Sequence, residues 1–112
     1  EGIYKVKAAK AEANIARYKL EDTKEKVELQ VTQNSYKVNE STKKLAMAEK
    51  NMEKAEENLR YANLGFKEGV IPTSNVLEAQ TAWFSAQAGK IDAQIDVKMN
   101  ELYLNKSMGI LK

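Results

Sequence analysis

The sequence predicts an all-α fold, in which two long antiparallel helices of unequal length form a coiled-coil hairpin. The first observation is compositional: 30% of the 112 residues are charged and only 7% are aromatic, with a single proline, which is typical of long helices and coiled coils. The second is that helix-breaking residues gather between Gly65 and Pro72. The third is that apolar residues recur at helical spacing on both sides of that segment.

The first predicted helix, residues 1–64, carries a sustained heptad pattern. Its register runs back towards Ile3 and is interrupted by polar residues such as Asn34 and Ser41. A 3.5-residue repeat of this length keeps one seam facing a partner helix and implies left-handed supercoiling. At ~1.5 Å per residue, the helix would reach about 90 Å. The apolar residues that alternate spacings of three and four before the turn are Leu45, Ala48, Met52, Ala55, Leu59, Ala62 and Phe66.

The second predicted helix, residues 75–112, carries two apolar stripes, which indicates neighbours on both of its flanks. One stripe contains Leu77, Phe84 and Ile91, and the other contains Val76 and Trp83. We expect the first of these stripes to pack against the heptad seam. The expected pairs are Phe66 with Leu77, Leu59 with Phe84, and Met52 with Ile91, and Leu45 continues the packing.

This register has a consequence for the first helix. The second helix would end opposite residues in the mid-thirties, so residues 3–34 would have no partner within this chain. These residues still carry apolar stripes, and a helix of this kind is marginal without tertiary packing. The sequence therefore predicts a further helical partner, from another part of the parent chain or from another subunit.

The predicted turn, residues 65–74, contains the residues that end one helix and start the next. Gly69 is the best candidate for a positive φ at the C-terminus of the first helix, and Pro72 disfavours helix at Ile71. Thr73, Ser74 or Asn75 can cap the second helix, and Asn75 with Glu78 has the spacing of a capping box.

Several function classes lack the residues that they need. The chain has no histidine and no cysteine, so we expect no catalytic residues, no metal site and no cofactor. Acidic and basic residues are interspersed around a net charge of +2, which gives nucleic-acid binding little support. There is no apolar run of about 20 residues and no signal-peptide core, so we expect this segment neither to span a bilayer nor to direct its own export.

The segment from Phe66 to Gln80 resembles the tip of channels in the TolC-like outer-membrane efflux family. The family pattern is an aromatic residue, two residues, glycine, five variable residues, and then an Asp/Asn-Val-Leu-Asp/Glu-Ala run. Phe66, Gly69 and residues 75–79 fit this pattern without a gap. Residues 1–12 are similar to the start of the long helix in the family's second repeat, and residues 105–111 to the end of its returning helix.

The resemblance implies a role in transport. Family members are trimers whose helices form a hollow periplasmic tunnel beneath a shared β-barrel in the outer membrane. The tunnel docks on a periplasmic adaptor protein that is coupled to an inner-membrane transporter, which supplies the energy. The chain would then be the periplasmic hairpin of the second repeat, a fragment of a trimeric α-helical barrel. We expect that it does not form the native trimer by itself, because the barrel strands and the other repeat are missing.

The resemblance also implies roles for residues near the turn. Glu68, Gly69, Val70 and Ile71 occupy the positions that meet the adaptor. Val70 and Ile71 are apolar residues at the end of a rod, and exposed apolar tips tend to be contact points.

A second group, Phe66, Asn75 and Glu78, occupies positions at the periplasmic entrance. Asn75 is uncharged, so this entrance would carry fewer negative charges than in members with an acidic residue there. In some members a tyrosine and an arginine near the turn form links that close the entrance. Phe66 lacks the hydroxyl and Ile71 lacks the guanidinium, so these links cannot form here.

Two other functions fit a helical hairpin. One is a purely structural coiled-coil scaffold in which the turn is a passive connection. The other is the coiled-coil hairpin of the periplasmic adaptor protein itself. The adaptor's two arms should be similar in length, whereas the two arms predicted here are unequal.

Overall fold

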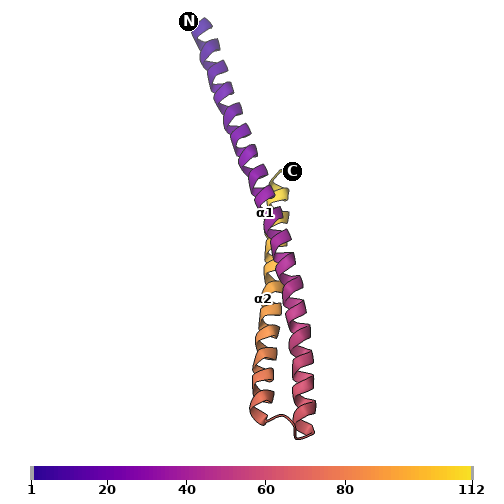
Figure 1. Ribbon diagram of the computed structural model, residues 1–112. Helices are drawn as coiled ribbons and strands as arrows, with labels where there is room; N and C mark the ends of the chain where they lie inside the picture. The colour runs from indigo at the N-terminus through magenta and orange to yellow at the C-terminus, as the bar shows by residue number, and fades with distance from the viewer. Residues whose placement is uncertain (1, 112) are drawn as a thin grey trace.

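The computed structural model describes residues 2–111 as two antiparallel α-helices, α1 (Gly2–Lys67) and α2 (Thr73–Leu111). They form a rod with principal extents of 100 × 17 × 14 Å, and α1 extends far beyond the end of α2 (Figure 1). The structure contains no strand within residues 2–111. The predicted hairpin with unequal arms is therefore confirmed. Glu1 and Lys112, which the predicted segments include, lie outside the described residues.

The helices begin and end where the local sequence changes. Between Gly2 and Gly65, α1 contains neither glycine nor proline, so nothing interrupts its backbone hydrogen bonds over 66 residues. Pro72 directly precedes α2, where a fixed φ and a missing N–H do not disturb a helix that is only starting. The connection is shorter than the predicted turn at 65–74, because α1 continues through Gly65 to Lys67 and α2 already begins at Thr73.

The heptad seam of α1 faces α2. Met52, Ala55 and Ala62 are buried, and Leu45 and Leu59 in the same seam are half-buried. On α2, the matching seam consists of Val76 and Val97, which are buried, and Ala79, Trp83, Ala86, Ala93 and Leu104, which are half-buried.

The prediction that Leu77, Phe84 and Ile91 pack within the hairpin is wrong. These side chains are 58%, 65% and 48% exposed, respectively. Successive residues are ~100° apart around a helix, so the two stripes of α2 point in different directions and one partner helix covers only one of them. The hairpin buries the stripe of Val76 and Trp83, and leaves the bulkier stripe uncovered.

Contacts across the seam also define the register. The side-chain amide of Asn34 donates to the Ser107 hydroxyl, and that of Asn100 donates to the Lys37 carbonyl at 3.5 Å. The predicted pairing, continued along the helices, would have placed Gly109 opposite Asn34. The same pairing would have placed Lys106 opposite Lys37. The two contacts therefore lie about two and about six residues from the predicted register, a mean shift of about one helical turn.

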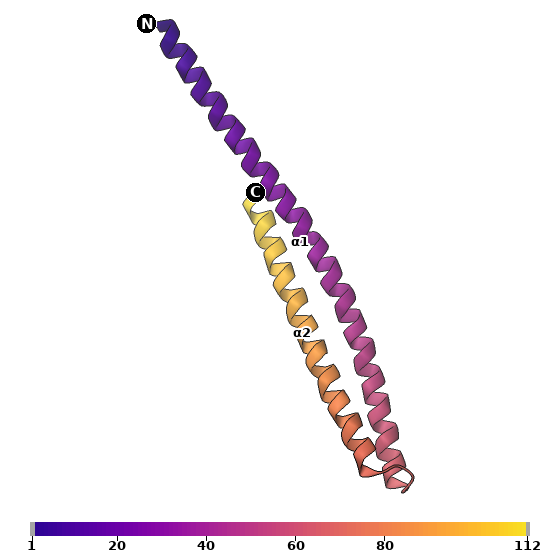
Figure 2. The same cartoon turned by 60° about the vertical axis from the view of Figure 1, so that its left-hand side comes forward.

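The shift changes how much of α1 lacks a partner. Every residue from 2 to 26 is exposed, and Val27 is the first half-buried residue of α1. The unpartnered segment is thus somewhat shorter than the predicted residues 3–34. Both views show this part of α1 continuing alone past the end of α2 (Figures 1 and 2).

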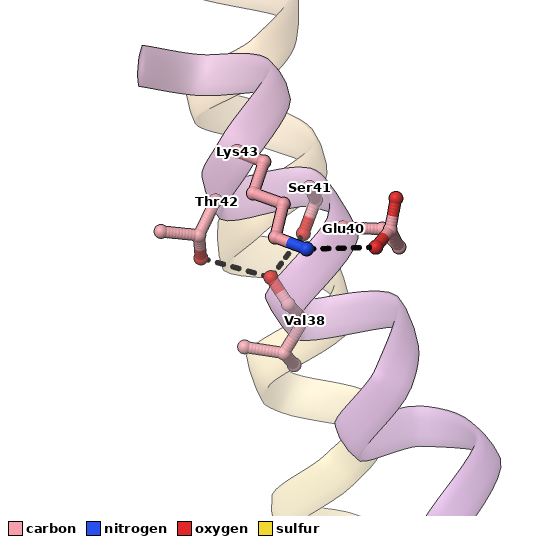
Figure 3. A network of polar contacts seen from close by, with 5 residues as sticks. All are labelled: Val38, Glu40, Ser41, Thr42 and Lys43. Atoms are coloured by element: carbon pink, nitrogen blue, oxygen red, sulfur yellow. Dashed lines mark hydrogen bonds and ion pairs between the residues drawn. The ribbon is translucent and has the colours of Figure 1, made fainter.

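Ser41 is a polar residue within the seam, and its hydroxyl finds a hydrogen-bond partner in its own helix. Ser41 is 6% exposed, and its hydroxyl donates to the Val38 carbonyl at 3.0 Å. The Thr42 hydroxyl donates to the same carbonyl at 2.8 Å, while Lys43 pairs with Glu40 at 3.4 Å on the surface (Figure 3). Within residues 2–111, no buried side-chain nitrogen or oxygen lacks a hydrogen-bond partner. Ser41 therefore interrupts the apolar seam without leaving an unsatisfied group in it.

The hairpin tip as a candidate functional site

The C-terminus of α1 ends in a Schellman motif centred on Gly69. The φ of Gly69 is 78°, which confirms the predicted left-handed residue. Its N–H donates to the Phe66 carbonyl at 3.0 Å, and the Val70 N–H donates to the Gly65 carbonyl at 2.8 Å. These two bonds satisfy carbonyls that have no partner further along the helix. The chain is thereby turned sharply towards α2 within a few residues.

Beyond Gly69 the chain folds back onto the last turns of α1. The Ile71 N–H also donates to the Gly65 carbonyl, at 3.1 Å, and the Ile71 side chain lies directly over Gly65. A Cβ atom on Gly65 would lie 2.6 Å from Ile71 Cγ1. The half-buried Ile71 is therefore part of the packing of the turn itself.

Val70 has the opposite orientation. Its side chain is 77% exposed, and Glu68 and Gly69 beside it are exposed too. Of the four residues predicted to contact the adaptor, Glu68, Gly69 and Val70 are thus available on the surface, whereas Ile71 turns inward. The end of the rod presents an apolar side chain with a carboxylate nearby.

The three residues predicted at the entrance lie around the same end of the hairpin. Phe66 is 49% exposed, and Asn75 and Glu78 are exposed on the first turns of α2. Because α2 starts at Thr73, Asn75 lies inside the helix rather than at its cap. Its N–H donates to the Pro72 carbonyl at 3.1 Å. Among residues 2–111 the capping box of Asn75 and Glu78 does not form, so both side chains remain available to other groups.

Residues 2–111 include neither a metal-binding cluster nor a membrane-spanning helix. Residues 2–111 contain no group of three or more acidic, histidine or cysteine side chains that could hold a metal ion. Neither helix carries, within these residues, an apolar stretch of the length and composition that a bilayer crossing needs.

A family comparison decides what kind of protein carries this tip. The family model described as outer membrane efflux protein matches residues 4–110. The chain belongs to the outer membrane efflux protein family. The match confirms the resemblance drawn from the tip motif, and it covers both helices as well as the turn. No curated protein and no solved structure matches the chain.

Membership of the outer membrane efflux protein family fixes the general class. The family is one of transport channels rather than enzymes, and its members belong to the outer membrane.

Sequence reasoning missed one residue of this site. Gly65 was assigned to the turn, but it lies in helix α1 and provides the surface against which Ile71 packs. The sequence did contain a signal for this contact. Gly65 precedes Gly69 by four residues, about one turn of helix, and the apolar Ile71 follows Gly69 by two.

Proposed function

We propose that this hairpin is part of the periplasmic tunnel of a trimeric outer-membrane efflux channel. The tunnel conducts substrates outward, and the tip of the hairpin docks on a periplasmic adaptor protein that is connected to an inner-membrane transporter. The hairpin itself binds no cofactor and performs no chemistry. The energy for transport comes from the inner-membrane partner.

The sides of the rod support the tunnel assignment. On α2, Phe84, Ile95 and Leu102 are 65%, 53% and 63% exposed, and on the unpartnered part of α1, Ile3 and Leu20 are 72% and 70% exposed. Large apolar side chains exposed along an entire rod favour association with further helices. A ring of helices supplies a neighbour on each flank of every helix, which would cover these stripes.

The observation that carries the docking assignment is the 77% exposure of Val70 at the end of the rod. The Schellman motif and the packing of Ile71 make the turn compact, so the apolar side chain at the end is presented on a defined backbone. A preformed contact surface loses little conformational entropy on binding. Glu68 beside it adds a charge that can select a complementary partner.

Two alternatives make different predictions. A purely structural scaffold would use the turn only as a connection, and Val70 would contact nothing. The coiled-coil hairpin of an adaptor protein is disfavoured by the family match to outer membrane efflux proteins over residues 4–110.

In-cell photo-crosslinking tests the docking proposal. A photoreactive amino acid is placed at Val70 of the intact protein, and a matched variant carries it at Met47, which is 65% exposed on α1 away from the tip. We expect Val70 to capture a periplasmic adaptor and Met47 to capture none. If Val70 in a correctly assembled protein captures only its own subunits, or nothing, the turn is a structural connection and the docking proposal is wrong.

A further inference from the structure

We propose that Gly65 is a positioning residue for the tip: its missing side chain lets Ile71 fold back over α1, and this leaves Val70 at the end of the rod. The inference deepens the proposed function and rests on docking through Val70. It assigns a role to a glycine that lies inside α1, beneath the side chain of Ile71.

The backbone around Gly65 carries the first part of the argument. The Gly65 carbonyl accepts hydrogen bonds from both the Val70 N–H, at 2.8 Å, and the Ile71 N–H, at 3.1 Å. A single backbone group thus fixes two consecutive residues of the turn. The orientation of the Val70 side chain depends on both bonds, because they define the backbone on either side of its Cα atom.

The side chain of Ile71 carries the second part. A Cβ atom added to Gly65 would come within 2.6 Å of Ile71 Cγ1 and 3.2 Å of Ile71 Cβ, and its closest contact would be Ile71 Cδ1. The first of these distances is far below an ordinary carbon–carbon contact of about 3.5–4.0 Å. A residue with a Cβ at position 65 would therefore force the Ile71 side chain out of its observed position, and would push Ile71 Cβ away by a few tenths of an ångström.

Gly65 differs in this respect from the other glycines. Gly69 is required by its φ of 78°, and a Cβ there would meet nothing within 4 Å. Gly65 lies inside α1 without a positive φ, where alanine is the better helix former. Backbone conformation therefore does not explain a glycine at this position, whereas contact with Ile71 does.

The test measures adaptor capture from a photoreactive group at Val70 in four variants: Gly65→Ala, Ile71→Ala, the double variant of both, and Gly89→Ala. Gly89 is the matched control, because it lies inside α2 and a Cβ there meets nothing within 4 Å. We expect Gly65→Ala to reduce capture about fivefold or more, because overpacking displaces the turn. Gly89→Ala should leave capture unchanged.

The double variant separates positioning from a general loss of structure. Shortening Ile71 to alanine removes the two atoms that would meet the new Cβ most closely, so capture in the double variant should return to the level of Ile71→Ala alone. Capture of the channel's own helices from a photoreactive group at Phe84, which is 65% exposed, serves as the measure of correct assembly in every variant. If Gly65→Ala captures the adaptor as well as Gly89→Ala does, the inference is wrong.

A second measurement applies if the photoreactive group at Val70 captures no adaptor in the protein with Gly65 and Ile71 unchanged, in which case the docking proposal itself fails. Amide hydrogen exchange of Val70 and Ile71 in the 112-residue chain then reports on the positioning alone. We expect Gly65→Ala to accelerate exchange at these two amides, while Gly89→Ala does not. Unchanged exchange at both amides in Gly65→Ala would overturn the role given to Gly65.

Discussion

The side-chain amide of Asn34 donates a hydrogen bond to the hydroxyl of Ser107 across the seam, with 2.6 Å between Nδ2 and Oγ. The two residues are 8% and 3% exposed. The Ser107 hydroxyl in turn donates to the Tyr103 carbonyl at 2.9 Å. This pair connects the last turns of α2 to the middle of α1. A slip of the helices would take the buried Asn34 amide away from its partner on α2, so this contact favours the observed register.

A double-mutant cycle measures this contact. We expect Asn34→Ala and Ser107→Ala each to lower the free energy of unfolding of the chain by about 1 kcal/mol. The double variant should lose less than the sum of the two, with a coupling energy of about 1 kcal/mol. Urea denaturation followed by circular dichroism gives the values. Strictly additive losses would show that the bond does not contribute to pairing.

Two methionines on α1 test the assignment of the seam. Met52 is 7% exposed in the seam, whereas Met47 is 65% exposed. We expect Met52→Ala to lower the free energy of unfolding by about 2 kcal/mol, because a buried side chain leaves a cavity. Met47→Ala should change it by less than about 0.5 kcal/mol. Equal losses from the two substitutions, measured by the same denaturation experiment, would place the seam elsewhere.

Two glycines should respond to alanine with opposite signs. Gly69→Ala puts a side chain at a φ of 78° and should lower the free energy of unfolding by about 1–2 kcal/mol. Gly89 lies within α2 in open space, so Gly89→Ala should raise it by about 0.5–1 kcal/mol. Thermal melts of the two variants provide the comparison. A stabilising Gly69→Ala would contradict the turn geometry.

The extent of the helices up to the turn and their antiparallel arrangement could be predicted because they depend on local sequence. The absence of breakers up to Gly65 and the heptads of Leu45 to Ala62 define α1, and Gly69 and Pro72 define the turn. The face that α2 turns towards α1 could not be predicted in the same way. Its two stripes, marked by Phe84 and Trp83, are both apolar, and the choice between them depends on the geometry of the turn.

At the tip, too, some features could be predicted from the sequence and others could not. The sequence motif located Gly69 and Val70, since a left-handed glycine and an exposed apolar residue follow from their positions alone. The opposite orientations of Val70 and Ile71 depend on the contact of Ile71 with Gly65, which periodicity does not reveal. The hydrogen bond between the buried Asn34 and Ser107 could not be predicted either, because in the heptad pattern Asn34 is only a polar interruption of the seam.

The unpartnered part of α1 should be less protected than the paired part. Residues 2–26 are all exposed in the hairpin, and most helical stability comes from tertiary packing. We expect amides of residues 6–26 in the isolated chain to exchange with deuterium much faster than those of residues 45–62. Mass spectrometry of peptic fragments compares both segments within one sample. Equal protection of the two segments would mean that residues 6–26 have a partner that the hairpin does not show.

The central claim is that further helices of a channel cover the exposed stripe of α2. Phe84, which is 65% exposed in the hairpin, tests it most directly when it is replaced by a photoreactive amino acid in the assembled protein. Lys50, exposed on α1, provides the control on a charged face. The account predicts efficient capture of the channel's own helices from Phe84 and much weaker capture from Lys50. If Phe84 captures nothing in the assembled protein and instead reacts with water, the stripe is uncovered and the hairpin is not part of a closed helical tunnel.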